Sequence, residues 1–136
     1  MFSLQSVPLE TLDLKKKIVG DGSGAVVIFE GIVRNATKGR AVIKLEYQAS
    51  PRLAQNEFEK IAAELREKFP VLNLICAHRV GTLFPGEMAV WAAVSAAHRG
   101  AAFDGCRFLV DELKHRLPIW KKEYFADGEA AWVASP

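Results

Sequence analysis

Basic side chains stand at the ends of apolar runs, which is where a rigid scaffold presents reactive groups. Arg34 closes one strand-like run, and His98 and Arg99 lie between a second such run and a helical pattern. Lys114 and Lys121 lie on either side of a proline that must end that helix. Cations that gather in a fold need an anion to offset their repulsion. These positions therefore predict a site for a small anionic substrate.

The pair His98-Arg99 directly precedes Gly100 and the expected start of a helix. A helix N-terminus carries unpaired N–H donors, so these amides and both side chains can converge on one anion. The alternative interpretation of the histidine is an ordinary capping or interior residue. We expect His98 and Arg99 to face the ligand.

Lys114 and Lys121 are candidates for proton transfer or nucleophilic work, because like-charged neighbours and partial burial favour a neutral amine. The basic residues of this stretch are Lys114, His115, Arg116, Lys121 and Lys122, and Glu123 is the nearby acid. In an extended segment Lys121 and Lys122 point to opposite faces, so only one can point with Lys114. The alternatives are a lysine that lies along an apolar helix surface and an edge strand that carries lysines against aggregation.

Familiar enzyme motifs are missing from the sequence, which contains no GxGxxG after a strand, no GxxxxGK[ST], no GxSxG and no HExxH. A metal site built from His78, His98 and His115 is not expected, because no carboxylate or thiolate is spaced to complete it. Cys76 and Cys106 stand in apolar surroundings and are expected to be buried free thiols. We expect neither a metal nor a cofactor.

Length and composition predict one domain over residues 1–136, with a core over 24–133 and a strand or helix extension over 1–23. The formal net charge of +2 is too small to argue for nucleic-acid binding. The N-terminus lacks the pattern of a signal peptide, and no apolar run approaches the roughly 18 residues of a membrane span. We expect a cytoplasmic protein that binds neither nucleic acid nor a membrane.

Hydrophobic periodicity predicts an α+β fold with mainly antiparallel sheets and two main amphipathic helices. The expected strands are 24–34 and 41–48, joined as a hairpin, and 71–79 and 87–97, joined as a second one. One helix is expected to begin at Ser50-Pro51 and end at Pro70, and another to span 100–117. The segments 119–125 and 129–133 follow as short elements, and 8–19 is a candidate helix.

Several segments resemble, in this order, the family of large, catalytic subunits of molybdopterin synthase. The matching segments are FEGIVRN at 29–35, LEY at 45–47, HRVGTLFPGE at 78–87, SAAHRGAAF at 95–103, and DELKHRLPIWKKE at 111–123, followed by DG and WV. The resemblance as a whole runs from about residue 24 to residue 133. The segment QASPRLAQ at 48–55 departs from the family, as does the short C-terminus after Trp132-Val133.

The resemblance implies a hammerhead-like fold and a sulfurtransferase activity on cyclic pyranopterin monophosphate, which forms the dithiolene of molybdopterin in molybdenum cofactor biosynthesis. The implied sulfur donor is a small ubiquitin-like subunit whose C-terminal Gly-Gly ends in a thiocarboxylate. Its tail would enter a pocket of this chain. Two large subunits would pair as a homodimer within a heterotetramer, and this subunit would need no metal or nucleotide.

The resemblance also implies roles for individual residues. Lys114 and Lys121 match the family's two essential lysines, suited to acid–base work and to orienting the thiocarboxylate. The implied substrate-binding residues are Ile32, Val33, Arg34, His98 and Arg99, with Lys122 and Glu123 completing the last loop.

Two other functions stay open from the residues alone. The first is a noncatalytic binding module for a protein tail or a small phosphorylated anion. The second is weak nucleic-acid binding through the basic stretch 114–122, which the small net charge disfavours.

Overall fold

The computed structural model describes residues 1–133, so the last three residues of the expected domain lie outside the described part. The elements are β1 (Phe2–Gln5), η1 (Leu9–Thr11), α1 (Leu14–Ile18), β2 (Ala25–Ile32), β3 (Ala36–Thr37), β4 (Arg40–Ala49), α2 (Pro51–Lys68), β5 (Val71–Arg79), β6 (Gly81–Leu83), β7 (Met88–Ala96), α3 (Arg99–Arg116), β8 (Ile119–Phe125) and β9 (Ala130–Val133).

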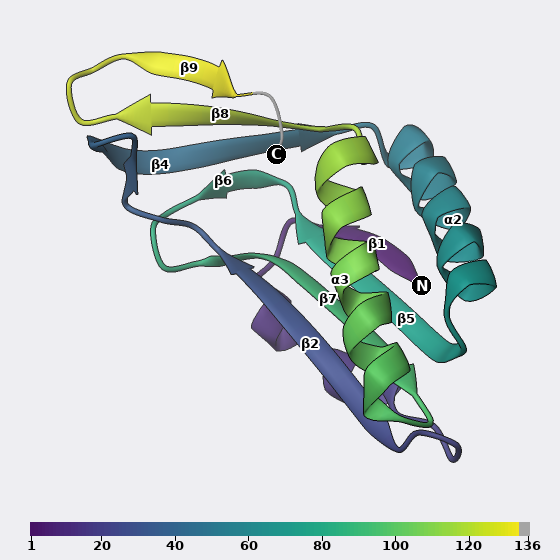
Figure 1. Ribbon diagram of the computed structural model, residues 1–136. Helices are drawn as coiled ribbons and strands as arrows, with labels where there is room; N and C mark the ends of the chain where they lie inside the picture. Colours follow the sequence, from purple (N-terminus) through teal and green to yellow (C-terminus); the bar gives the residue numbers. More distant parts are fainter. Residues whose placement is uncertain (134–136) are drawn as a thin grey trace.

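Two sheets organise the fold. The first has the order β1-β5-β7-β2, in which only the β1–β5 pair is parallel. The second has the order β3-β4-β8-β9, with β6 paired to β4. The long helices α2 and α3 lie together against the first sheet, and the strands of the second sheet run across their ends (Figure 1). The expected α+β class with mainly antiparallel pairing and two main helices is confirmed.

The expected hairpin between residues 24–34 and 41–48 is wrong. β2 pairs with β7 in the first sheet, whereas β4 pairs with β8 and β6 in the second. The physical reason is that the two strands bury their apolar faces in different cores. Phe29 packs against the helices, and Val42 and Leu45 pack in a separate cluster. The second expected pair is present, since β5 and β7 are antiparallel neighbours.

Helix α2 begins where the sequence predicted, with Ser50 as its N-cap and Pro51 as its first residue. The Ser50 hydroxyl accepts a hydrogen bond from the Leu53 amide at 3.4 Å, and Pro51 occupies the first turn, where no amide donor is needed. The N-terminal candidate helix at 8–19 is instead two short pieces, η1 and α1, separated by Leu12 and Asp13.

The main core lies between α2, α3 and the first sheet. Cys76 and Cys106 belong to it as buried free thiols, as expected, and burial raises the pKa of Cys76 to about 12 and that of Cys106 to about 11. Gly105 lets α3 approach the sheet closely, because a Cβ there would lie 2.9 Å from Val71 Cγ1. Within residues 1–133, no helix is long and apolar enough to cross a membrane.

The packing of α3 predicts a large effect at Leu109, whose side chain is 0% exposed. Leu109→Ala should lower the free energy of unfolding by about 2 to 5 kcal/mol, because it removes buried methyl groups and leaves a cavity. Leu53→Ala is the matched control on α2, where the side chain is 54% exposed. Urea denaturation followed by circular dichroism measures both, and equal losses would contradict this account of the core.

Candidate active site

A small cavity of about 60 Å³ opens where the end of β2 meets β4 and β8. Its lining residues come from separate stretches of the chain: Ile32, Val33, Arg34, Thr37, Leu45, Tyr47, Lys121 and Glu123. Predicted site residues from 32–34 and from 121–123 therefore share one cavity. Thr37 and Tyr47 were not among the predicted residues.

The register of β4 and β8 determines which side chains face the cavity. Tyr47 pairs with Lys121, and Leu45 pairs with Glu123. Side chains two positions apart on a strand share a face, so all of these point to the same side of the second sheet. The cavity is thus built by strand pairing between segments about 75 residues apart in the sequence.

Lys122 points to the other face, as the alternation predicts for one of two successive lysines. Its partner in the register is Glu46. Its Nζ lies 5.2 Å from the ring centroid of Tyr124 and 5.6 Å from that of Trp132, which are cation–π contacts. In this chain Lys122 therefore lies on the opposite side of the sheet from Lys121.

The backbone before Arg34 is held by a turn that follows β6. The Val33 amide donates to the Glu87 carbonyl, and the Gly86 amide donates to the Val33 carbonyl, both at 2.9 Å. The buried Arg79 guanidinium fixes the turn through an ion pair of 3.1 Å with the Glu87 carboxylate. Arg34 is exposed at the rim of the cavity. The backbone that leads into Arg34 is therefore held rigidly, although the Arg34 side chain reaches into solvent.

Glu123 is a buried carboxylate, only 2% exposed, within the cavity wall. The Thr37 hydroxyl donates a hydrogen bond of 2.6 Å to Glu123 Oε2. The Lys121 ammonium lies 4.0 Å from Oε1. Glu123 therefore holds the lysine in position and supplies a negative charge that offsets part of its positive charge.

Tyr47 lies beside these groups and keeps its proton. Burial and the negative charge of Glu123 together raise the pKa of Tyr47 to about 12. Its ring meets the His78 ring edge to face, with the centroids 5.0 Å apart. His78 Nδ1 is 2.7 Å from the Arg79 carbonyl, so this nitrogen carries the ring proton.

Lys114 lies in the last turn of α3 and is exposed. Its Nζ is 5.8 Å from the ring centroid of Phe29 on β2. Phe29 precedes Ile32 by three residues, about 10 Å along the strand. Lys114 does not line the small cavity but stands over the strand that leads to it. Both predicted lysines thus lie near the joint between α3 and β8.

Arg116, part of the basic stretch, is engaged within the fold. Its guanidinium forms ion pairs of 2.8 Å with Glu57, 2.7 Å with Glu64 and 3.8 Å with Glu112. Two of these acids lie on α2, so the pairs join the two long helices. The density of cations in the sequence therefore overstated the charge available to a ligand.

His98 and Arg99 lie at the other end of α3 from Lys114. Arg99 and Lys114 stand fifteen positions apart on this helix, which is about 22 Å at about 1.5 Å per residue. Both His98 and Arg99 are exposed, and the His98 side chain forms no capping hydrogen bond. Within a single chain they do not meet the lysines.

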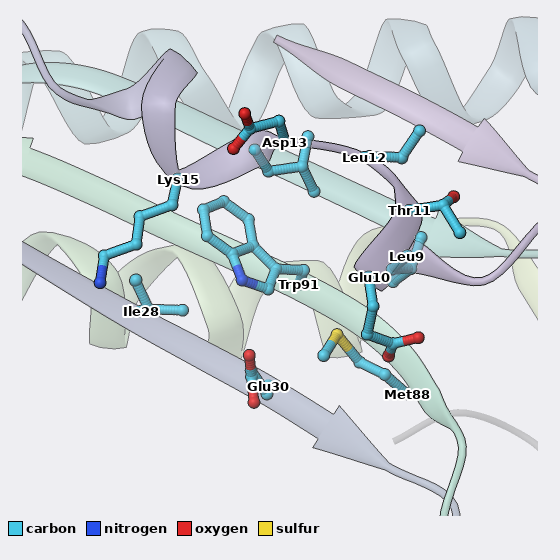
Figure 2. A pocket seen from close by; sticks show the side chains of 11 residues that line it. Leu9, Glu10, Thr11, Leu12, Asp13, Lys15, Ile28, Glu30, Met88 and Trp91 are labelled. Atoms are coloured by element: carbon cyan, nitrogen blue, oxygen red, sulfur yellow. The ribbon is translucent and has the colours of Figure 1, made fainter.

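A larger cavity, of about 410 Å³, lies on the face of the first sheet away from α2 and α3. Figure 2 shows the Trp91 indole between the N-terminal segment and β2, with Glu30 beside it. Glu10 and Asp13 add further carboxylates to this wall. The predicted site residues are not among those that line it, and its acidic character does not suit an anionic substrate.

Metal ligation finds no support in residues 1–133, where no group of three or more His, Cys, Asp or Glu side chains could hold a metal ion. The chemistry available at the small cavity is that of the Lys121 amine, the Arg34 guanidinium, the buried Glu123 carboxylate and the neutral Tyr47 phenol, with Lys114 outside the lining.

Comparison with known proteins identifies the family. The model of the MoaE protein family matches residues 4–116. The chain belongs to the MoaE family. The molybdopterin synthase catalytic subunit of a Nostoc species is 40% identical over 98% of this chain and 81% of that protein. The catalytic subunit of Bacillus subtilis is 37% identical over 97% of this chain and 83% of its own length.

Solved structures agree with this MoaE assignment. The molybdopterin synthase of Staphylococcus aureus superposes with a TM-score of 0.86 at 33% identity, covering 97% of this chain and 94% of that one. A complex of subunits 1 and 2 of molybdopterin-converting factor from Helicobacter pylori contains a chain with the same fold, with a TM-score of 0.79 at 21% identity, covering 97% of this chain and 89% of that one. The expected family, and the expected function as a molybdopterin synthase catalytic subunit in molybdenum cofactor biosynthesis, are confirmed.

The buried His78 ring predicts a pH dependence of stability. Burial lowers the pKa of His78 from about 6.5 to about 4, although the hydrogen bond to Arg79 opposes this change. The unfolded chain therefore takes up this proton at a higher pH than the folded chain. Stability should fall by up to about 3 kcal/mol as the pH falls from 6.5 to 4.

Urea unfolding of the parent and of His78→Gln at pH 6.5 and 4.5 tests this prediction. The loss on acidification should be smaller in His78→Gln, and His115→Gln, which alters an exposed histidine on α3, should keep the parent's loss. An unchanged pH dependence in His78→Gln would contradict the assignment.

Proposed function

We propose that this chain transfers sulfur from the C-terminal thiocarboxylate of a small ubiquitin-like subunit to cyclic pyranopterin monophosphate at the cavity between β2, β4 and β8. The observation that carries the proposal is the convergence of Arg34, Lys121 and Glu123 on one cavity from distant parts of the chain. A cytoplasmic location belongs to the same proposal, and the two buried free thiols are compatible with a reducing compartment.

The size of the cavity supports a division between the two substrates. At about 60 Å³ it offers the space of about two water molecules. A pterin ring is too large for it, whereas the end of a glycine tail has no side chains to accommodate. The thiocarboxylate would therefore enter the cavity beside Lys121, and the pterin would lie at the exposed rim near Arg34.

The proposed chemistry assigns a task to each charged group. Lys121, held by Glu123, orients the thiocarboxylate and moves protons. The thiocarboxylate sulfur forms a bond to a pterin side-chain carbon while a carbon–oxygen bond of that carbon breaks, and a lysine supplies a proton to the departing oxygen. Water then adds to the acyl carbon of the resulting thioester. The acyl carbon–sulfur bond breaks, which leaves a carboxylate on the partner and the sulfur on the pterin. Lys114 supplies a second proton carrier at the rim.

Recognition of the phosphate by His98 and Arg99 requires a second copy of the chain. Their distance of about 22 Å from Lys114 along α3 prevents them from serving the same ligand within one chain. We infer a homodimer in which His98 and Arg99 of one protomer complete the rim of the other, where Arg34 lies. Glu123 then contributes from the protomer that holds the cavity, whereas Lys122 lies on the other face of the sheet and has no part in this arrangement.

The free edge of β2 supports this arrangement. β2 has eight residues and ends the first sheet, with exposed Ile28 and Ile32 along it. Antiparallel pairing of two such edges about a two-fold axis brings the start of one β2 beside the end of the other. Ala25 pairs with Ala96, two residues before His98, so His98 of the second copy would approach Ile32 to Arg34.

The small subunit is the remaining partner in the proposal. The Helicobacter pylori relative was solved as a complex of two subunits, and its fold matches this chain. The exposed rim and the narrow cavity suit a chain end that arrives from a second protein. The full assembly would be a heterotetramer of two large and two small subunits.

Removal of either lysine tests the reaction. In reconstitution with thiocarboxylated small subunit and cyclic pyranopterin monophosphate, Lys121→Ala and Lys114→Ala should each lower turnover at least about 100-fold, a size typical of lost transition-state stabilisation. Lys60→Ala is the control, since Lys60 is exposed on α2. Full activity of both site variants would refute the assignment.

A noncatalytic binding module would give a different result for the parent and the lysine variants in the same reconstitution assay. The parent would then bind the small subunit but form no dithiolene product, and the lysine variants would lose only binding.

Mixed dimers test the shared site. Arg99→Ala and Lys121→Ala should each be inactive alone, but in a mixed dimer one of the two sites would contain neither substitution. After unfolding and refolding of an equal mixture, about a quarter of the parent activity should return, because half of the dimers are mixed and each has one intact site. No recovery would show that each site belongs to a single protomer.

A further inference from the structure

We propose that Tyr47 is a further residue of the sulfur-transfer site, whose hydroxyl donates a hydrogen bond to the oxygen of the partner's thiocarboxylate. The same donor would stabilise the oxyanion that forms when water adds to the acyl carbon. This inference rests on the proposed function, because it names an additional group for the same reaction.

The position of Tyr47 carries the inference. Tyr47 lines the cavity and is the direct cross-strand partner of Lys121 on β8. Directly opposed residues of an antiparallel pair have Cβ atoms about 4.5 to 5.5 Å apart. A ligand held by the Lys121 ammonium in so small a cavity must therefore lie within reach of the Tyr47 side chain.

The ring of Tyr47 is held in place before any ligand arrives. It packs against two apolar clusters, one under the helices and one under the second sheet. It also meets the His78 ring edge to face at 5.0 Å, and the His78 ring is itself fixed by its hydrogen bond of 2.7 Å to the Arg79 carbonyl. A donor that needs no reorganisation is the kind that favours a developing charge most.

The charge state of Tyr47 determines its role. Because burial and the Glu123 carboxylate raise its pKa to about 12, the phenol stays protonated at physiological pH. A neutral phenol donates a hydrogen bond but cannot accept a proton as a base. Tyr47 therefore adds a neutral hydrogen-bond donor beside the basic side chain of Lys121.

The proposed reaction has a step that needs such a donor. When water adds to the acyl carbon, its oxygen forms the new bond and the acyl oxygen takes up the electron pair of the C=O bond. That pair returns as the carbon–sulfur bond breaks and the sulfur leaves on the pterin. In the thioester the acyl oxygen is neutral, and it carries a full negative charge only between these events, so a hydrogen bond to it accelerates turnover more than it strengthens the binding of the small subunit.

Tyr47→Phe is the direct test, because it removes the hydroxyl and keeps the ring that packs against His78. We expect kcat to fall about 100-fold, while the Kd for the small subunit and the thermal midpoint stay within the error of the parent. Tyr124→Phe is the matched control from β8, since Tyr124 lies on the face of the sheet away from the cavity, with its hydroxyl 3.5 Å from Glu46. Its kcat should equal that of the parent.

The outcomes separate the inference from the proposed function. If Lys121→Ala is inactive in the same assay but Tyr47→Phe turns over within twofold of the parent, Tyr47 has no role in the reaction and the inference is overturned. If Lys121→Ala is fully active, the proposed function itself fails. Equal losses in Tyr47→Phe and Tyr124→Phe would also overturn the inference, because the effect would not belong to the cavity.

A second variant keeps the test decisive if Tyr47→Phe does not fold. 3-Fluorotyrosine at position 47 retains the hydroxyl and the packing but makes the phenol more acidic. If the neutral phenol is the required donor, the alkaline limb of the kcat profile should move to lower pH than in the parent. An identical profile would count against the inference.

Discussion

The antiparallel register between β4 and β8 is the constraint on which the candidate site depends. It places Tyr47 opposite Lys121 and Leu45 opposite Glu123, so one pairing fixes a cation, a carboxylate and a phenol on a single face. A shift of this register by one residue would turn every one of these side chains to the other face, because strand side chains alternate. The buried Glu123 opposes such a shift, since its charge must keep its partners Thr37 and Lys121.

Several basic residues of the sequence lie away from the cavity, so few positive charges remain at the cavity itself. Arg116 joins the two long helices through glutamates of α2 and of its own helix, and Lys122 lies on aromatic rings of the outer face. Lys121 and Arg34 are left at the cavity, where Glu123 offsets part of their charge. Such an arrangement tolerates cations in the ligand-free protein and still favours the entry of an anion.

Much of the local structure could be predicted from the sequence. Hydrophobic periodicity predicted α2, on which Phe58, Ile61 and Leu65 are buried, and the Ser50-Pro51 start has the expected cap. The divergence of Lys121 and Lys122 also followed from strand alternation alone. These features depend on residues within a few positions of each other, where periodicity and capping chemistry determine the outcome.

Long-range pairing could not be predicted in the same way. β2 and β4 were expected as a hairpin, but each found a partner far along the chain. Thr37 bonds Glu123 across 86 positions, so no local pattern marked it as part of the site. His98 and Arg99 were identified by residue type and by the family motif, yet their distance from Lys114 follows only from the length of α3.

Burial of both cysteine thiols protects them from reactive sulfur. Exchange and persulfide formation need a thiolate that a reagent can reach, and Cys76 and Cys106 are buried with their pKa raised well above neutral pH. The two cysteines therefore offer no competing acceptor, and in the proposed reaction sulfur delivered by a carrier would pass to the small molecule instead of being diverted onto these thiols.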